Sequence, residues 1–200
     1  MFSVIMPTMW RSYRTVSLIN SICSSTVVSE LIIIDNNPKS RPRFDVDSKV
    51  VMIDQKENIY VNPAWNLGVK ESNEDYICII NDDITMDCES VFPYVLNAVK
   101  KIPCIGIHSS SYNYKGAEIL MTVGHDIGRG WGCCMFLDKR KWVDIPEQIK
   151  IWFGDNWIVK TYQDCASIVT SISTEMSTTS NDKQLSDVIK NDIEEWNKKK

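Results

Sequence analysis

Residues 76–83 read Tyr76-Ile77-Cys78-Ile79-Ile80-Asn81-Asp82-Asp83. The first five residues form a hydrophobic run without polar alternation, which is typical of a strand buried on both faces of a parallel sheet. Three polar residues then end the run abruptly. Because ligands of open α/β sheets bind beyond the carboxyl ends of the strands, this stretch predicts a central strand with a binding site at its end.

Short hydrophobic runs on both sides of this stretch alternate with segments of helical spacing. The expected strands cover residues 2–6, 30–34, 50–53, 76–80, 104–108 and 133–137. The expected helices cover residues 11–24, 62–71, 90–101, 155–163 and 183–198. Such alternation is typical of βα units, so the sequence predicts an α/β fold with a mostly parallel sheet. Residues 109–132, which are rich in Ser, Gly, Asn and Tyr, are expected to form irregular or hairpin structure of the kind that closes over a site.

Length and composition favour one compact domain and exclude some classes of partner. The 200 residues are 44% hydrophobic and 24% charged, which is ordinary for a globular domain. A net charge of -4 argues against nucleic-acid binding, which is driven by clustered Lys and Arg. The seven cysteines lack zinc-binding spacing and are interpreted as reduced core residues. No apolar stretch approaches the roughly 20 residues that a membrane-spanning helix needs.

The neighbouring carboxylates of Asp82 and Asp83 are candidates for a metal site. Two such groups at a strand end repel each other unless a cation or strong donors stabilise them. Oxygen ligands favour Mg²⁺ or Mn²⁺, and a cation with open positions can hold two phosphate oxygens of a nucleotide diphosphate. The sequence has no phosphate-binding glycine loop, so a phosphate ligand would need the metal. The alternative that stays open is a simple strand-end turn or helix cap.

Four segments in chain order carry a family resemblance. They are residues 3–8 (Ser-Val-Ile-Met-Pro-Thr), residues 30–36 (Glu-Leu-Ile-Ile-Ile-Asp-Asn), Asn58 with residues 66–68 (Asn-Leu-Gly), and residues 76–83. Together they resemble the N-terminal motifs of GT-A glycosyltransferases similar to family 2, over residues 2–90 closely and 130–160 loosely. The family pattern usually reads Asp-x-Asp, whereas Asn81 stands first here, which lowers the negative charge offered to a metal.

The resemblance implies a single GT-A (Rossmann-like) domain over residues 1–200, with a central, mostly parallel mixed sheet flanked by helices. Residues 1–108 would bind the nucleotide, residues 109–170 would bind the donor sugar and the acceptor, and residues 180–200 would form a C-terminal helix and tail. The Asn-Lys-Lys-Lys ending is interpreted either as a solvated tail or as a boundary before further domains, which would make the chain the N-terminal domain of a longer protein.

The same resemblance implies roles for individual residues. Donor contacts would come from Pro7, Thr8, Asp35, Asn36, Asn58, Asn66 and Asp82. In this scheme Thr8 and the Asp35-Asn36 turn line the uridine pocket, because an Asp or Asn suits the imide N–H and neighbouring carbonyl of uracil. Asp83 is the direct ligand of Mn²⁺ or Mg²⁺, and Asp82 contacts the ribose or a metal-bound water. For Asn58 and Asn66, capping of loops and helices stays an equal alternative.

The second half of the chain supplies the expected catalytic base. Asp155 lies in Trp152-Phe153-Gly154-Asp155-Asn156-Trp157, a segment similar to the one in which inverting members place an acidic base. Its alternative role is helix capping. Trp152 and Trp157 are expected to stack on a sugar or to pack in the core. Arg129, with His125 and Asp126, lies in the glycine-rich stretch and would reach the diphosphate or metal, or belongs to a polar loop.

The sequence therefore predicts a transferase that moves a hexose from a UDP-sugar to a glycan or lipid-linked acceptor, with inversion at the anomeric carbon. A non-catalytic GT-A-like module that binds a nucleotide sugar or glycan is the alternative. A sugar-phosphate nucleotidyltransferase is disfavoured because no glycine-rich basic loop follows residues 2–6. The expected location is the cytoplasm, or the host cytoplasm if the source is a virus.

Overall fold

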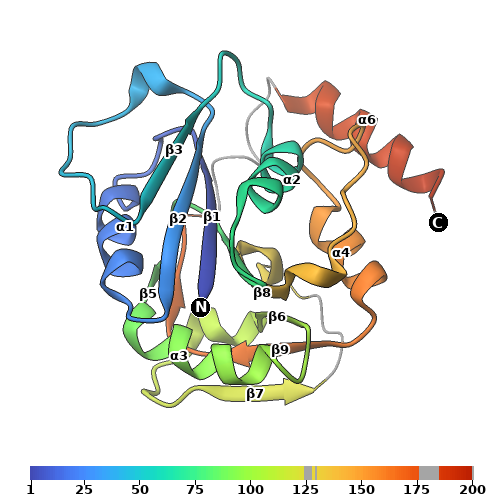
Figure 1. The fold of residues 1–200 in the computed structure, drawn as a ribbon. Coiled ribbons are helices and arrows are strands. Elements are labelled where there is room, and N and C mark those ends of the chain that lie inside the picture. The colour runs from blue at the N-terminus through green and yellow to red at the C-terminus, as the bar shows by residue number, and fades with distance from the viewer. Residues whose placement is uncertain (124–127, 129, 176–184, 200) are drawn as a thin grey trace.

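The computed structural model describes residues 1–123, 128, 130–175 and 185–199 of the chain. Its centre is an eight-stranded sheet with the order β3-β2-β1-β4-β8-β6-β9-β7 (Figure 1). The strands of this sheet are β1 (Phe2–Thr8), β2 (Val28–Asp35), β3 (Val50–Asp54), β4 (Tyr76–Ile80), β6 (Cys104–Ile107), β7 (Leu120–Val123), β8 (Cys134–Asp138) and β9 (Cys165–Val169). A separate two-stranded ribbon pairs β5 (Thr85–Met86) with β10 (Ile172–Ser173).

The sheet is mixed, and its N-terminal half is wholly parallel. Strand β1 pairs in parallel with β2 and β4, and β2 pairs in parallel with β3. Strand β8 then runs antiparallel between β4 and β6, and β7 closes the other edge antiparallel to β9. The α/β class with a mostly parallel central sheet is therefore confirmed.

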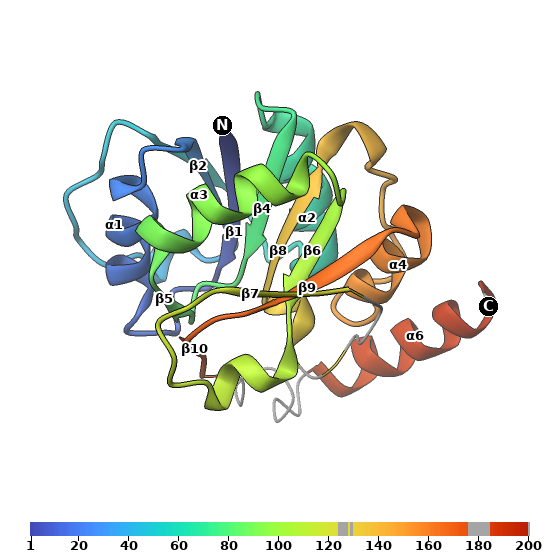
Figure 2. The same cartoon turned by 90° about the horizontal axis from the view of Figure 1, so that it is seen from below.

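Helices cover both faces of the sheet. Helices α1 (Thr15–Ser24) and α3 (Cys88–Val99) lie on one face, and α2 (Val61–Glu71) and α4 (Gly154–Tyr162) lie on the other (Figures 1 and 2). Helix α6 (Ser186–Asn197) lies outside α4. Short 3₁₀ turns occupy Pro38–Ser40, Ser109–Asn113, Trp131–Cys133 and Lys139–Lys141. No helix in the described part of the chain is both long and apolar enough to cross a membrane.

Alternating side chains of β1 build the two halves of the core. Val4 and Met6 are fully buried in the cluster beneath α1 and α3, whereas Ile5 is fully buried in the cluster with α2 and α4. Successive side chains of a strand point to opposite faces, so a continuous apolar run serves both layers. The continuous runs in β2 and β4 are buried for the same reason.

Most of the expected elements form with small shifts at their ends, and one expectation needs correction. Asn62 was expected to cap its helix, but α2 begins at Val61 after Tyr60, and the Asn62 side chain bonds to a distant loop instead. Strands β5, β7, β9 and β10 were not among the expected strands. Of the expected helix 183–198, residues 183 and 184 lie outside the described residues.

Candidate functional site

The polar residues that follow the central strands meet at one edge of the sheet. The chain forms β1, β2 and β3 in one direction and then places β4 on the other side of β1. The carboxyl ends of β1 and β4 thus flank the point at which the strand order reverses, where open α/β sheets bind ligands. A cavity of about 550 Å³ opens there.

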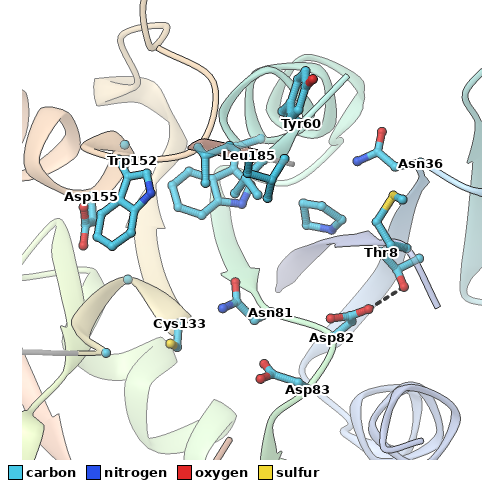
Figure 3. A pocket seen from close by; sticks show the side chains of 18 of the residues that line it. Thr8, Asn36, Tyr60, Asn81, Asp82, Asp83, Cys133, Trp152, Asp155 and Leu185 are labelled. Atoms are coloured by element: carbon cyan, nitrogen blue, oxygen red, sulfur yellow. Dashed lines mark hydrogen bonds between the residues drawn. The ribbon is translucent and has the colours of Figure 1, made fainter. Parts of the chain in front are cut away.

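The cavity brings together most of the site residues expected from the sequence. Those that line it are Pro7, Thr8, Asn36, Asn58, Asp82, Asp83, Trp152 and Asp155. Figure 3 shows Trp152 and Asp155 on one side of the cavity, and Thr8, Asp82 and Asp83 on the other. Residues as far apart in the sequence as Pro7 and Asp155 therefore line one cavity.

Asp82 links β1 to β4 across the switch point. Its Oδ2 accepts a hydrogen bond of 2.5 Å from the Thr8 hydroxyl, and its backbone carbonyl accepts one from the Thr15 hydroxyl. Burial is the largest influence on the Asp82 carboxyl and raises its pKa to about 6, with repulsion from Asp83 adding to the rise and the Thr8 bond opposing it. This carboxyl is held rigidly at the cavity wall, where a cation would favour its ionised form.

Asp83 is held from the C-terminal part of the chain. Its Oδ2 accepts bonds of 2.6 Å from the Thr174 hydroxyl and 2.9 Å from the Glu175 backbone N–H, just after β10. Its Oδ1 is buried and has no hydrogen-bond partner among the described residues. A buried carboxylate oxygen without a partner is costly, so the arrangement suits a cation or a donor supplied by a ligand.

The charge of the cavity also suits a cation. The charged side chains among its described lining residues are Asp82, Asp83, Asp155, Glu175 and Arg11. Within the described residues, no three His, Cys, Asp or Glu side chains converge on a metal position. A cation here would need ligands from outside this set, and the oxygens of a bound diphosphate are such ligands.

Asp155 lies in the first turn of α4 on the opposite side from the carboxylate pair. Phe153, with φ 63°, precedes the helix in a left-handed conformation, so Asp155 is not the residue that caps it. The Oδ1 of Asp155 accepts a bond from the Asn156 N–H, and burial raises the pKa of Asp155. A Cβ atom at Gly132 would lie 2.9 Å from the Asp155 Cβ, so a glycine there leaves room for the carboxyl.

The structure separates Asp35 from its neighbour Asn36. Asp35 is fully buried and does not line the cavity, because its carboxylate accepts bonds from the Asn37 N–H and the Arg41 guanidinium at 2.9 and 2.7 Å. Asn36 does line the cavity, and its Oδ1 accepts from the Ile59 N–H at 3.1 Å. The amide of Asn36, rather than the carboxylate of Asp35, is therefore placed to meet a ligand.

Of the remaining expected site residues, Asn58 lines the cavity, whereas Asn66 and Trp157 make structural contacts outside it. The Asn58 Oδ1 accepts from the Tyr60 N–H, and Asn58 still lines the cavity. Asn66 lies outside this cavity and exchanges two hydrogen bonds with the backbone of Ile145. Trp157 also lies outside it, partly buried against the core, with its Nε1–H bonded to the Val143 carbonyl. Arg129, His125 and Asp126 lie outside the described residues.

Sequence reasoning missed several lining residues, most of them apolar. Among these are Tyr60, Trp65, Cys133 and Leu185, together with Glu175. Tyr60 carries a signal only in its backbone, a φ of 68° that is unusual for an aromatic residue. Glu175 and Leu185 follow the segment of family resemblance, so no motif pointed to them.

An open α/β sheet with polar residues beyond the carboxyl ends of its central strands is typical of proteins that bind a ligand at the switch point. Residues 3–169 match the family model described as Glycosyl transferase family 2, and the chain belongs to this family. No curated protein sequence matches the chain significantly.

Solved structures share the fold at low sequence identity. TarS 1–349 from S. aureus superposes with a TM-score of 0.60 at 14% identity, covering 84% of this chain and 58% of that one. HddC from Yersinia pseudotuberculosis superposes with a TM-score of 0.58 at 15% identity, covering 86% and 92%. Further structures of TarS 1–349, in complex with UDP and with UDP-GlcNAc, give TM-scores of 0.56 and 0.54 at 13% identity, covering 84% of this chain and 57% and 56% of those chains. This chain thus spans less than two thirds of the length of TarS 1–349.

Proposed function

We propose that this chain is a glycosyltransferase that moves a hexose from a UDP-sugar to a carbohydrate acceptor, with a divalent cation at Asp82 and Asp83 and inversion at the anomeric carbon. The observation that carries the proposal is the single cavity in which the Asp82-Asp83 pair faces Asp155 (Figure 3). Family membership and the UDP and UDP-GlcNAc complexes of TarS support this choice of donor.

The carboxylate pair would hold Mn²⁺ or Mg²⁺. Asp83 would offer its Oδ1, which is buried without a partner among the described residues, and Asp82 would contact the cation or a water on it. When bound, the cation would offset the charge that develops on the departing diphosphate. Without it, a diphosphate would meet a cavity whose described charged lining is four carboxylates and one arginine.

The nucleoside would lie between β1 and β2. The Asn36 amide and the Thr8 hydroxyl lie at the ends of these strands and line the cavity. The Nδ2 of Asn36 makes no hydrogen bond to the described residues, and an amide N–H suits a carbonyl oxygen of uracil. Asp35 would act behind it, by fixing the loop through Arg41.

Asp155 would act as the general base. An ionised carboxylate beside the acceptor hydroxyl can take its proton while the oxygen attacks the anomeric carbon in line with the departing diphosphate. The raised pKa of Asp155 makes it a stronger base than an exposed aspartate. Trp152, which is 40% exposed and lines the cavity, offers an indole face on which a sugar can stack.

Calorimetry of UDP binding with Mn²⁺, and again with EDTA, tests the metal-dependent donor site. We expect micromolar-range binding only with the cation, and we expect Asp83→Asn to weaken it by at least the 10- to 100-fold typical of lost metal-supporting groups. Asp75→Asn is the matched control, since Asp75 is 66% exposed at the opposite end of β4. Equal affinity for UDP in EDTA would contradict the metal site, and metal-dependent binding without transfer to any of a panel of glycans would favour the non-catalytic module.

A further inference from the structure

Helix α6 lies beyond residues 3–169, the part of the chain that matches the family model, yet it contacts the candidate site. Asp192, in the second turn of α6, is fully buried. Its carboxylate accepts three backbone hydrogen bonds, from the N–H groups of Lys150, Ile151 and Trp152, at 2.7, 2.7 and 2.9 Å. The helix thereby binds the loop that leads into the cavity wall.

The carbonyl groups of the same loop are bound from the other side. The Asn62 Nδ2 donates to the carbonyls of Ile149 and Trp152 at 3.2 and 3.0 Å, and the Asn62 backbone N–H donates to the Lys150 carbonyl. Residues 149–152 therefore lie between α2 and α6: α6 binds the N–H groups of residues 150–152, and α2 binds the carbonyls of residues 149, 150 and 152. Two opposed sets of bonds over four residues leave this backbone little freedom.

The loop sets the position of the residues that follow it. Trp152 lines the cavity, and Phe153 then adopts its left-handed conformation before α4 begins. The Phe153 ring stacks on Trp196 of α6, with centroids 5.3 Å apart and planes at 2°. An aromatic residue at positive φ is strained and persists only when its surroundings hold it, so α6 fixes the turn that presents Asp155.

We propose that Asp192 is a positioning residue of the transfer site. It orders residues 150–152, and through them Trp152 and Asp155, without touching the substrate itself. The role in transfer rests on the proposed function, whereas the ordering of the loop does not. Because Asp82 and Asp83 lie in the turn that follows β4, across the cavity, the donor diphosphate site should not depend on Asp192.

Asp192→Asn tests the proposal, with Asp187→Asn, an exposed aspartate of the same helix, as the matched control. An amide cannot accept all three bonds and places an N–H group against one of the loop donors. In the absence of ligand, amide exchange at residues 150–152 should accelerate by about tenfold to a hundredfold, the range for losing hydrogen bonds to a charged group, while β1 and β4 stay protected. Unchanged exchange at 150–152 would overturn the proposal.

Kinetics separate positioning from general destabilisation. We expect kcat for transfer to fall about tenfold or more while metal-dependent UDP binding stays within about twofold, because the loss affects only the side of the cavity that holds Asp155. A parallel fall in UDP affinity would overturn the positioning role. If wild type binds no UDP, the proposed function fails, and the exchange measurement still decides whether Asp192 orders the loop.

A second variant tests the role of α6 even if Asp192→Asn does not fold. Trp196→Leu removes the ring that stacks on Phe153 and leaves the carboxylate in place. It should accelerate exchange at residues 151–155 and lower kcat in the same direction, again with UDP affinity within about twofold. Wild-type exchange and wild-type kcat in this variant would contradict the role assigned to α6.

Discussion

At the scale of single residues, the site gathers carboxyl groups whose ionised form is destabilised by burial. Burial raises the pKa of Asp155 and of Asp82, so each ionised side chain is less stable here than in water. The described residues give Asp82 one side-chain donor, the Thr8 hydroxyl, and give Asp83 donors on only one of its two oxygens. Buried carboxylates with too few donors are typical of functional sites, where a ligand or cation supplies the missing partners.

The pH dependence of Asp155→Asn follows from this raised pKa. As a base, Asp155 must be ionised, so the transfer rate of wild type should rise with pH through a value above that of an ordinary aspartate. The variant should transfer about a hundredfold more slowly or worse at every pH and should lose that rise, with donor binding unchanged. Rate profiles from pH 4 to 8 measure this.

The contribution of Asp155 to the stability of the fold should fall as pH rises, whereas the transfer rate should rise. A carboxyl whose pKa is raised on folding stabilises the fold below its unfolded pKa, and this contribution is lost as pH rises through the folded pKa. Asp155→Asn should therefore gain stability relative to wild type at neutral pH and not at pH 3. Asp164→Asn, exposed beyond the end of α4, is the control. If Asp155→Asn transfers the sugar at the wild-type rate, Asp155 is not the base.

At the scale of elements, the sequence predicted all strands of the parallel half of the sheet, and in the second half it predicted β6 and β8 but not β7 and β9. The strands β1, β2 and β4 are continuous apolar runs whose burial is a local signal. Strand β9 reads Cys-Ala-Ser-Ile-Val, short and with small residues, and its identity depends on long-range pairing with β6 and β7. The same difference applies to the site. Residues after strands were found by position, whereas Leu185 lines the cavity, and Asp192 supports its wall, only through long-range packing.

Contacts between helices fix the cavity wall, and Gly154 of α4 packs tightly against Asn62 and Trp65 of α2. A Cβ atom at Gly154, the first residue of α4, would lie 2.2 Å from the Asn62 Oδ1 and 2.7 Å from a carbon of the Trp65 ring. Asn62 cannot simply move aside, because its amide holds two loop carbonyls. Gly154→Ala should therefore lower the free energy of unfolding by about 1–3 kcal/mol, as overpacking usually does.

A double-mutant cycle with Asn62→Ala checks the cause. If the clash is with Asn62, Gly154→Ala should cost less in the Asn62→Ala background, with an interaction energy of about 0.5–3 kcal/mol. Denaturant unfolding of the four proteins measures it. Additive effects would mean that helix α4 shifts as a unit and that Asn62 does not set its position.

At the scale of the whole molecule, the cavity lies at one end of the strands, and the opposite end of the strands carries only structural contacts among the described residues. The cavity lies beyond the carboxyl ends of β1 and β4. At the opposite edge, the Glu30 carboxylate accepts bonds from the Ser3 hydroxyl and from Asn73, and hydrogen bonding from these partners lowers its pKa. Ligand binding should therefore stabilise the two edges unequally.

A second hollow offers the nucleotide an alternative place to bind, and the pattern of protection can distinguish it from the main cavity. It lies between Glu57, Asn58, Ile59, Tyr60, Pro63, Asn66, Glu147 and Lys150, next to the main cavity, and it lacks the carboxylate pair. Saturation with UDP and Mn²⁺ at about 100 times Kd should stabilise the chain by about 2.7 kcal/mol. If the ligand binds at the switch point, local protection from amide exchange should appear at residues 8–12, 36–37 and 81–83, which come from three separate strand ends. Residues 72–75 at the opposite edge should gain nothing beyond the global stabilisation.

Asp83→Asn under the same conditions should lose the whole pattern, and Asp75→Asn should keep it. Protection confined to residues 57–66 and 147–150 would instead place the nucleotide in the second hollow and remove the Asp82-Asp83 pair from donor binding.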